Sequence, residues 1–232
     1  MYEALSPDAT INGGAASAAL RKPLPRGFYA RPTTLVAADA IGKFLVSRSA
    51  DGVAVGRIVE TEAYLGPEDR AAHSHGGRRT ARTEAMWGAP GHAYVFMIYG
   101  MHFHFNLVTA RKGAPEAVLI RAVEPVVGAE LMSARRAVDV ARRELTNGPG
   151  KLCEAFAIGR DDYGLDLCDA SSRLFLADGP PSPRVARSAR IGVDYAGIWA
   201  NEPLRYFDPE SRYVAARTRT RTRTRTRRRA AA

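Results

Sequence analysis

The amino-acid sequence predicts one α+β domain: a mostly antiparallel, curved sheet with packed helices and one protruding β-hairpin. The first observation behind this prediction is size, because 232 residues that are 46% hydrophobic suffice for one sizeable core. The second is a series of apolar runs with strand composition, two of which are joined by only a few residues around Tyr99-Gly100-Met101. The third is the helical spacing of apolar residues in other segments of the chain.

The two ends of the chain differ in composition from its middle. Residues 1–26 are rich in Pro, Gly and Ala, and we expect them to form a flexible lead-in. Residues 214–232 contain an Arg-Thr repeat with eight arginines and no acid. Because its charges repel and it has no apolar face, we expect this tail to be disordered. It is either a low-complexity extension or a nonspecific phosphate-binding arm. Residues 27–213 remain as the domain.

The composition excludes several classes of protein. No run of about 18 apolar residues exists, so no membrane span is expected, and the N-terminus lacks the pattern of a secretory signal. The two cysteines, Cys153 and Cys168, form neither a disulfide framework nor a metal motif, which favours a reducing cytoplasm. The net charge of +10 indicates a polyanionic partner, but it falls to +2 without the eight arginines of the repeat.

The first half of the domain is expected to contain a helix, two strands and two short helices, over residues 35–45, 44–49, 53–65, 67–73 and 81–87. Thr33 and Thr34 are placed to cap the first helix. The dipeptide Asp51-Gly52 can turn the chain between the two strands. The short helices fall within a polar segment, 66–91, that is rich in Gly, Arg and His. So long an excursion from a compact domain usually carries function.

The second half is expected to contain four strands and two helices, over residues 92–100, 101–109, 116–126, 172–179, 128–145 and 147–159. The first two of these strands form the protruding hairpin. In the last helix Asn147 or Gly148 can be the cap, Pro149 suits the first position, and Gly159 can end it. Residues 184–207 have a mixed pattern that predicts no regular element.

Two acids in an apolar strand are the first candidates for chemistry. Glu60, Glu62 and Tyr64 alternate along the strand and should therefore point to the same face. Carboxylates spaced in this way are about 6.5–7 Å apart, which could suit a glycosidase pair. A carboxylate there can also activate water or stabilise a cationic transition state. The alternative is that both acids pair with some of the many arginines of this chain.

Histidines and aromatic residues give weaker signals. His73 and His75, like His102 and His104, have the spacing of two metal ligands, but no acid or cysteine completes a set, so we expect no metal. His102 and His104 can equally belong to an ordinary strand face. Tyr99, at the hairpin tip, could act as a wedge between bases or be a simple turn residue.

A turn at a helix start is the last candidate. The sequence Asn-Gly-Pro-Gly-Lys, which ends at Lys151, offers free backbone N–H groups and a lysine to an anion. It is not a P-loop, because the required spacing of Gly and Lys is absent. Four arginines add local positive charge in the long polar segment, namely Arg70, Arg78, Arg79 and Arg82.

Taken together, the segments RIVETEAYLGPEDRAAHSHGGRRT, MIYGMHFHFNLV, AVLIRAVEP and GPGKLC resemble the alkyladenine (3-methyladenine) DNA glycosylase family, and specifically the type that includes the mammalian alkylpurine glycosylase. They occur in the same order as in that family, and the resemblance covers roughly residues 27–207. It implies a compact single domain that inserts an aromatic hairpin tip into the minor groove of double-stranded DNA. Such an enzyme flips a damaged purine into a pocket and hydrolyses its N-glycosidic bond.

The resemblance also implies roles for individual residues. The residues implied in water activation and placement are Glu62, Arg121 and Ile191. The residues implied to line the base pocket are Tyr64, His73, Phe96 and Asn106. Those implied at the DNA backbone and base stack are Tyr99, Met101, Gly148, Gly150 and Lys151. Phe96 stands where some relatives have tyrosine, and His102 where an aromatic residue is common. Two extra residues are expected between Asn106 and Arg121.

We predict a monofunctional enzyme. The segment around Glu62 contains no lysine that could form a Schiff base with the sugar and so cut the DNA backbone. The enzyme needs no cofactor, and we expect a cytoplasmic monomer, associated with the nucleoid if the source is bacterial. The alternatives are a DNA-binding protein that recognises damaged or bent DNA without catalysis, and a carbohydrate hydrolase using Glu60 and Glu62. The preferred lesion and the role of Glu60 are left open by the sequence.

Overall fold

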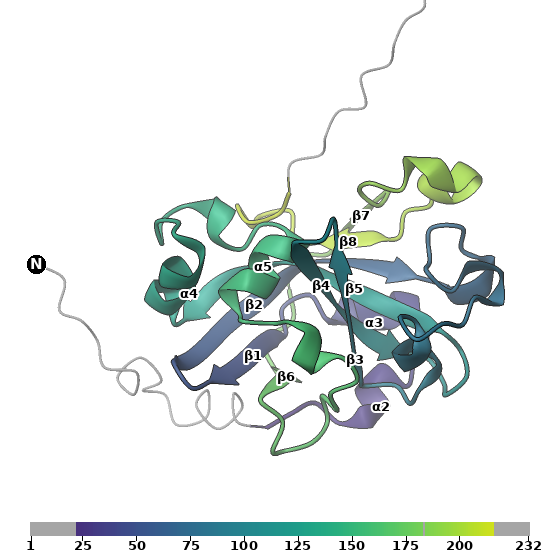
Figure 1. Cartoon of the computed structure of the whole chain (residues 1–232). Coiled ribbons are helices and arrows are strands. Elements are labelled where there is room, and N and C mark those ends of the chain that lie inside the picture. The colour runs from purple at the N-terminus through teal and green to yellow at the C-terminus, as the bar shows by residue number, and fades with distance from the viewer. Residues whose placement is uncertain (1–21, 183, 216–232) are drawn as a thin grey trace, which may run out of the picture.

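The computed structural model describes residues 22–182 and 184–215, and it shows one domain around a curved antiparallel sheet (Figure 1). Six strands follow the order β3-β4-β5-β2-β1-β6, and β8 pairs with both β2 and β7. The strands are β1 (Phe44–Ser49), β2 (Gly52–Tyr64), β3 (Ala93–Ile98), β4 (His102–Thr109), β5 (Glu116–Val127), β6 (Leu174–Ala177), β7 (Ala186–Ser188) and β8 (Arg205–Phe207). The predicted α+β class and the predicted antiparallel sheet are both confirmed.

Four α-helices and several short 3₁₀ segments accompany this sheet in the described chain. The α-helices are α2 (Arg26–Tyr29), α3 (Thr33–Asp39), α4 (Ala129–Arg136) and α5 (Pro149–Ala155). The 3₁₀ turns are η1 (Gly66–Glu68), η2 (His75–Gly77), η3 (Glu84–Trp87), η4 (Arg143–Leu145), η5 (Arg160–Asp162) and η6 (Asp194–Ala200). Helix α3 packs against β2 and β5, and α5 packs against β4 and β5. The main core lies between these helices and the sheet.

The longest strand, β2, organises the sheet, because it pairs with β1 and β5 along its length and with β8 near its end. The ladder between β2 and β5 is irregular on both sides of Glu60, where Val59 and Arg121 are each passed over in the register. Such bulges bend a strand and redirect side chains, and they are common beside active sites. Here they lie at the two candidate acids.

The hairpin of β3 and β4 stands upright beside α5 (Figure 1). Its tip is a tight turn in which Tyr99 (φ 53°) and Gly100 (φ 71°) both have positive φ. The Met101 N–H donates to the Ile98 carbonyl over 3.2 Å and closes the turn. Two consecutive positive φ values match the twist of the flanking strands, which explains why a glycine stands here.

Several predicted helix boundaries are wrong. Helix α3 ends at Asp39 rather than 45, and neither predicted threonine caps it: Pro32 is the N-cap. The Thr33 hydroxyl instead lies 2.7 Å from the Thr109 hydroxyl and donates to Glu116 over 2.6 Å. The residue is buried and joins the helix to β4 and β5, so a tertiary contact replaces the expected cap.

The predicted helix over 128–145 is interrupted. Helix α4 ends at Arg136, because Ala137 adopts a left-handed conformation with φ 51°. The chain turns there, and Leu145 reaches the core with no exposed surface. Helix α5 has Gly148 as its N-cap and a proline at its start, as predicted, but it ends at Ala155, before Gly159.

The chain termini lie partly outside the description. Residues 1–21 of the predicted lead-in and 216–232 of the predicted tail are not among the described residues. The described ends are packed. Pro23 bridges to Ala177 of β6, and Leu24 is buried. At the other end Tyr213 is buried against Val59.

Candidate active site

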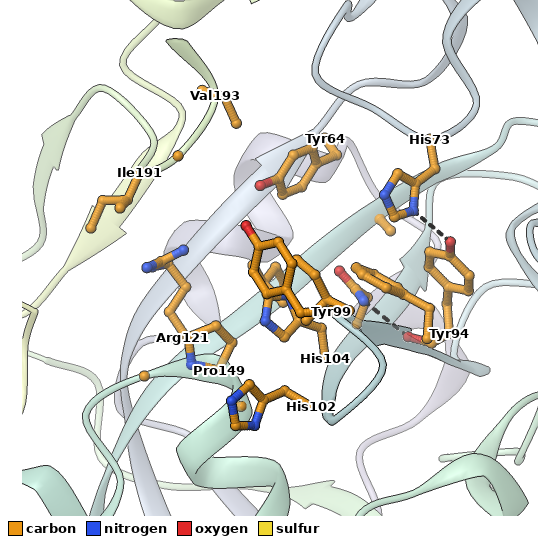
Figure 2. A pocket seen from close by; sticks show the side chains of 18 of the residues that line it. Tyr64, His73, Tyr94, Tyr99, His102, His104, Arg121, Pro149, Ile191 and Val193 are labelled. Carbon is orange, nitrogen blue, oxygen red and sulfur yellow. Dashed lines mark hydrogen bonds between the residues drawn. The ribbon is translucent and has the colours of Figure 1, made fainter. Parts of the chain in front are cut away.

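A cavity of about 540 Å³ opens between the hairpin, the sheet, the start of α5 and the segment before η6. Its walls include every predicted site residue except Glu62 and Met101, namely Tyr64, His73, Phe96, Tyr99, Asn106, Arg121, Gly148, Gly150, Lys151 and Ile191. Figure 2 shows Arg121 at one side of the cavity and His73 at the other. The fold therefore brings together residues that are up to 127 positions apart in the sequence, from Tyr64 to Ile191.

Glu62 of β2 lies directly behind the cavity wall, with no exposed surface. Its Oε1 accepts the N–H of Ile191 over 2.7 Å, and its Oε2 accepts the hydroxyl of Tyr64 over 2.8 Å. The Nη1 of Arg121 is 3.2 Å from the same Oε2. All three partners line the cavity, so the carboxylate is held at its edge by groups that a bound ligand would touch.

Glu60, two residues earlier, has a different environment. It is also fully buried, but it does not line the cavity. Its Oε1 accepts Nε of Arg121 over 3.1 Å and Nε of Arg205 over 2.6 Å. Pairing with arginines, the alternative left open by the sequence, holds for both acids: Glu60 meets Arg121 and Arg205, and Glu62 meets Arg121. The two acids are joined only through Arg121.

The ionisation of the groups around Glu62 follows from burial and charge. Burial acts to lower the pKa of Arg121, but the carboxylates of Glu62 and Glu60 raise it overall, so the guanidinium stays charged. Burial, together with the charge of Glu62, raises the pKa of Tyr64 well above its usual value. The phenol therefore stays protonated and donates to the acid.

The opposite wall of the cavity is aromatic. Nδ1 of His73 is 2.7 Å from the hydroxyl of Tyr94, and the ring centroid of Phe96 is 4.5 Å from that of His73 (Figure 2). The Asn106 side-chain amide donates to the Tyr94 carbonyl over 3.0 Å, which fixes its orientation. Burial, then Arg82 and Arg78, lower the pKa of His73 to about 4, so the ring is neutral at pH 7. These contacts form an uncharged aromatic wall, in which the rings of His73 and Phe96 contact each other.

The hairpin tip projects large apolar side chains into solvent beside this wall. Tyr99 is 85% exposed and Met101 is 70% exposed. A folded protein rarely leaves two large apolar side chains together on a rigid turn without a binding role. The positive φ of Tyr99 costs free energy that a simple turn residue such as Asn or Gly would avoid.

The start of α5 closes the cavity on the side of the hairpin. Gly148 caps the helix, and Nζ of Lys151 donates to the side chain of Asn147 over 2.8 Å. A Cβ at Gly150 would lie 3.1 Å from Cβ of His102, so glycine permits the helix to approach the hairpin. Burial and neighbouring arginines lower the pKa of Lys151, although Glu144 opposes them.

A buried ion pair supports the site, and no local signal in the sequence indicates it. Arg190 donates to both oxygens of Asp69, over 2.5 and 2.8 Å, and neither side chain has exposed surface. The guanidinium also lies 4.7 Å from the ring centroid of Tyr64. The pair joins the polar segment after β2 to the segment that carries Ile191. No local pattern could reveal two partners 121 residues apart.

His104 also lines the cavity, although its sequence pattern was equally consistent with an ordinary strand face. It lies opposite Phe96 in the register, and the two ring centroids are 5.4 Å apart. Burial, then Arg121, lowers its pKa to about 4. The signal was its spacing, because His102, His104 and Asn106 alternate onto the same face of β4. Within the described ranges no three His, Cys, Asp or Glu side chains gather as potential metal ligands.

The site combines a buried acid, an aromatic cavity wall and an exposed hairpin tip, an arrangement suited to an enzyme that acts on a planar group of a larger ligand. The sequence model of methylpurine-DNA glycosylase matches residues 27–212. The chain therefore belongs to the methylpurine-DNA glycosylase family, DNA-repair hydrolases that cleave the N-glycosidic bond of alkylated bases.

Three relatives show how complete the likeness is, and each carries the name "Putative 3-methyladenine DNA glycosylase". The protein of Methanocella arvoryzae is 50% identical over 84% of this chain and 96% of its own length. That of Desulfitobacterium hafniense is 45% identical over 84% and 100%. That of Myxococcus xanthus is 47% identical over 83% and 93%. No helix in the described chain has the length and apolar character needed to cross a membrane.

Proposed function

We propose that this glycosylase flips alkylated or deaminated purines out of double-stranded DNA and hydrolyses their N-glycosidic bond with a water activated by Glu62. Its substrates are lesions of the 3-methyladenine, 7-methylguanine, hypoxanthine and ethenoadenine class. The observation that carries the proposal is the position of Glu62, buried behind the cavity wall and held by Tyr64, Arg121 and the N–H of Ile191.

The reaction follows from the charges of this site. A purine alkylated at N3 or N7 is cationic, so it leaves readily with the electron pair of the bond to C1′. Positive charge then develops on the sugar, and the Glu62 carboxylate stabilises it. The water oxygen bonds to C1′, and its proton passes to Glu62. Arg121, 3.2 Å from Glu62, and the backbone of Ile191 hold the acid and place the water.

The aromatic part of the cavity selects the base. The rings of His73 and Phe96 contact each other and form one side, with Tyr64 on the other, so a flat ring can stack between Tyr64 and this pair. His73 is neutral at pH 7 and does not repel a cationic base. Asn106 crowds the exocyclic amine of normal guanine. Phe96 carries no hydroxyl, so this enzyme lacks the contact that a tyrosine there would make.

The remaining assignments concern DNA outside the cavity. Tyr99 fills the space of the flipped nucleotide, with Met101 beside it in the minor groove. The helix start holds a phosphate through Gly148, Gly150 and Lys151. The protein acts as a cytoplasmic monomer of the mammalian alkylpurine glycosylase type, needs no cofactor, and uses its Arg-Thr tail as a nonspecific DNA contact. It has no strand-nicking activity, since no lysine shares the strand of Glu62.

The test is base release from a duplex with one hypoxanthine or ethenoadenine, or from methylated DNA, followed by alkali to cut abasic sites. We expect alkali-dependent strand breaks with the native protein and none with Glu62→Gln. Breaks without alkali would contradict the monofunctional assignment. The matched control is Glu124→Gln, which removes a carboxylate of β5 that pairs with Arg57 over 2.6 Å, away from the cavity. Base release by Glu62→Gln, or tight lesion binding without release by the native protein, would overturn the proposal.

A further inference from the structure

Glu60 is a buried acid with three donors and no access to the cavity. Arg121 and Arg205 each donate Nε to its Oε1, and the N–H of Ala215 donates to Oε2 over 2.9 Å. A fully desolvated carboxylate is costly unless it is paired and hydrogen-bonded in this way. A buried apolar side chain would avoid this cost, so the presence of an acid beside the candidate catalytic acid suggests a role other than packing.

Arg121 connects this acid to Glu62. Glu60 holds Nε of the guanidinium, while a different nitrogen, Nη1, lies 3.2 Å from Glu62. The guanidinium is planar and rigid, so fixing Nε also fixes the direction of Nη1. Without Glu60, nothing would hold Nε of Arg121, and its guanidinium could turn and present other nitrogens to Glu62.

The charges of the cluster are balanced. Two carboxylates, Glu60 and Glu62, meet two guanidiniums, Arg121 and Arg205, and all four side chains are at most 10% exposed. Arg205 contacts Glu60, whereas only Arg121 contacts both acids. Neutralising Glu60 would leave one excess positive charge in the low-dielectric interior. The excess positive charge of Arg121 would lie beside Glu62, whose negative charge stabilises the cationic sugar in the proposed reaction.

The last described residue, Ala215, provides the third hydrogen-bond donor to Glu60. Ala215 is bound at both of its backbone groups: its N–H donates to Glu60, and its carbonyl accepts Nη2 of Arg205 over 2.9 Å. Tyr213 anchors this segment by packing into the small cluster with Val59 on β2. Residues 213–215 thus contact the cluster from outside the sheet, and they lie immediately before the Arg-Thr tail.

We propose that Glu60 is a positioning residue for base release, and that residues 213–215 complete its binding site, so that the C-terminal segment of the domain sets the orientation of Arg121 toward Glu62. This inference rests on the proposed function, because it gives Glu60 its effect through Arg121 and Glu62. It predicts that loss of either contact slows the chemical step and leaves lesion binding intact.

The first experiment compares Glu60→Gln with the native protein in single-turnover base release at saturating enzyme, with lesion-DNA affinity and thermal unfolding measured in parallel. A displacement of a catalytic group by about 1 Å can cost about 100-fold in rate, and we expect a loss of that order with an affinity within about twofold. Glu60→Asp should recover part of the rate. The matched control is Asp208→Asn, since Asp208 is also buried but pairs with Arg57 over 2.9 Å.

The second experiment compares two truncations, one that ends at Ala215 and one that ends at Arg212. Both lack the Arg-Thr tail, so any difference between them belongs to residues 213–215. We expect the shorter chain to release the base about 10-fold or more slowly than the longer one at saturating enzyme. If Glu60→Gln does not fold, this pair carries the test, because all four charged side chains of the cluster are then retained.

Three results would overturn the inference. A native rate in folded Glu60→Gln is the first, and equal rates in the two truncations is the second. A rate loss in Asp208→Asn as large as that in Glu60→Gln is the third, because the loss would then follow stability alone. Failure of the proposed function is distinguished by Glu62→Gln: if that variant still releases the base, the assignment of the catalytic acid is wrong whatever Glu60 does.

Discussion

At the scale of single residues, Glu60 and Glu62 show how neighbours divide roles between identical side chains. They share a strand and a face, but Glu62 is held by groups that line the cavity and Glu60 by two arginines and a backbone N–H. Position in the strand could not separate them. Their partners come from β5, β8 and the segments near Ile191 and Ala215, which are distant in sequence.

Two of the histidines that line the cavity, His73 and His104, should have pKa values far below the usual range. Burial lowers the pKa of each from 6.5 to about 4 in the folded protein. Between these values the unfolded chain binds more protons, so acidification from pH 6.5 toward 4 should reduce the free energy of unfolding. The measurement is a titration of imidazole NMR resonances, assigned with His73→Asn and His104→Gln. Midpoints near 6.5 would contradict the prediction.

The buried ion pair should matter far more for stability than an exposed one. In Asp69→Asn, Arg190 keeps its charge but loses its partner in the interior, which typically costs about 3–5 kcal/mol. Denaturant unfolding measures this change. The control is Glu84→Gln, whose pair with Arg79 is more than half exposed, and it should leave stability nearly unchanged. Similar small effects in both variants would show that the buried pair is not structural.

At the scale of elements, the hairpin of β3 and β4 combines two tasks. Its inward-facing side chains, including Phe96 and Asn106, line the cavity, while its tip exposes Tyr99 and Met101. The rigid turn couples the two, because Gly100 and the bond from Met101 to Ile98 fix the tip relative to the strands. Helix α5 packs against β4 and supports the hairpin through this contact.

The substitution Tyr99→Ala tests the tip as a wedge. The side chain is 85% exposed, so stability should not change, but base release from a normal duplex should fall by about 10- to 100-fold. Because an unpaired base costs less to flip, the defect should shrink when the lesion lies in single-stranded DNA. Leu35→Ala, at an exposed apolar residue of α3, is the control. Equal defects on both substrates would argue for a role other than flipping.

At the scale of the whole molecule, charge is divided between a nearly balanced body and a basic tail. Eight arginines of the tail account for most of the net charge of +10. The last described residue, Ala215, is held beside the strand that carries both acids, so the tail begins near the candidate active site. An arm attached there could reach the DNA that the site engages.

Deletion of residues 216–232 should weaken DNA binding mainly at low salt. Each phosphate contact adds about 0.9 to the slope of log affinity against log salt, so the slope should become shallower. Fluorescence anisotropy with undamaged duplex over a range of salt concentrations measures it. A parallel deletion of residues 1–21 controls for chain length. An unchanged slope would identify the tail as a low-complexity extension.

The predictions from sequence were best where a signal is local. The strands β2, β3 and β4 and the tight turn at Gly100 were predicted correctly, and so was the Gly-Pro start of α5. Helix ends were read poorly. Thr33 carries the signal of a cap but uses its hydroxyl for β4 and β5, and Ala137 interrupts a helical pattern without any local signal.

By itself, the sequence determined the fold class, the family and the strand that carries both acids, because these depend on composition, periodicity and motifs that lie within short segments. Only the tertiary structure decided that Glu62 is held by three groups that line the cavity, and that Glu60 is held by Arg121, Arg205 and the N–H of Ala215. It also revealed the Asp69–Arg190 pair and the contact of Ala215 with Glu60. The physical reason is that the cost of a buried charge depends on its partners, and here, apart from Tyr64, those partners come from segments more than 50 residues away.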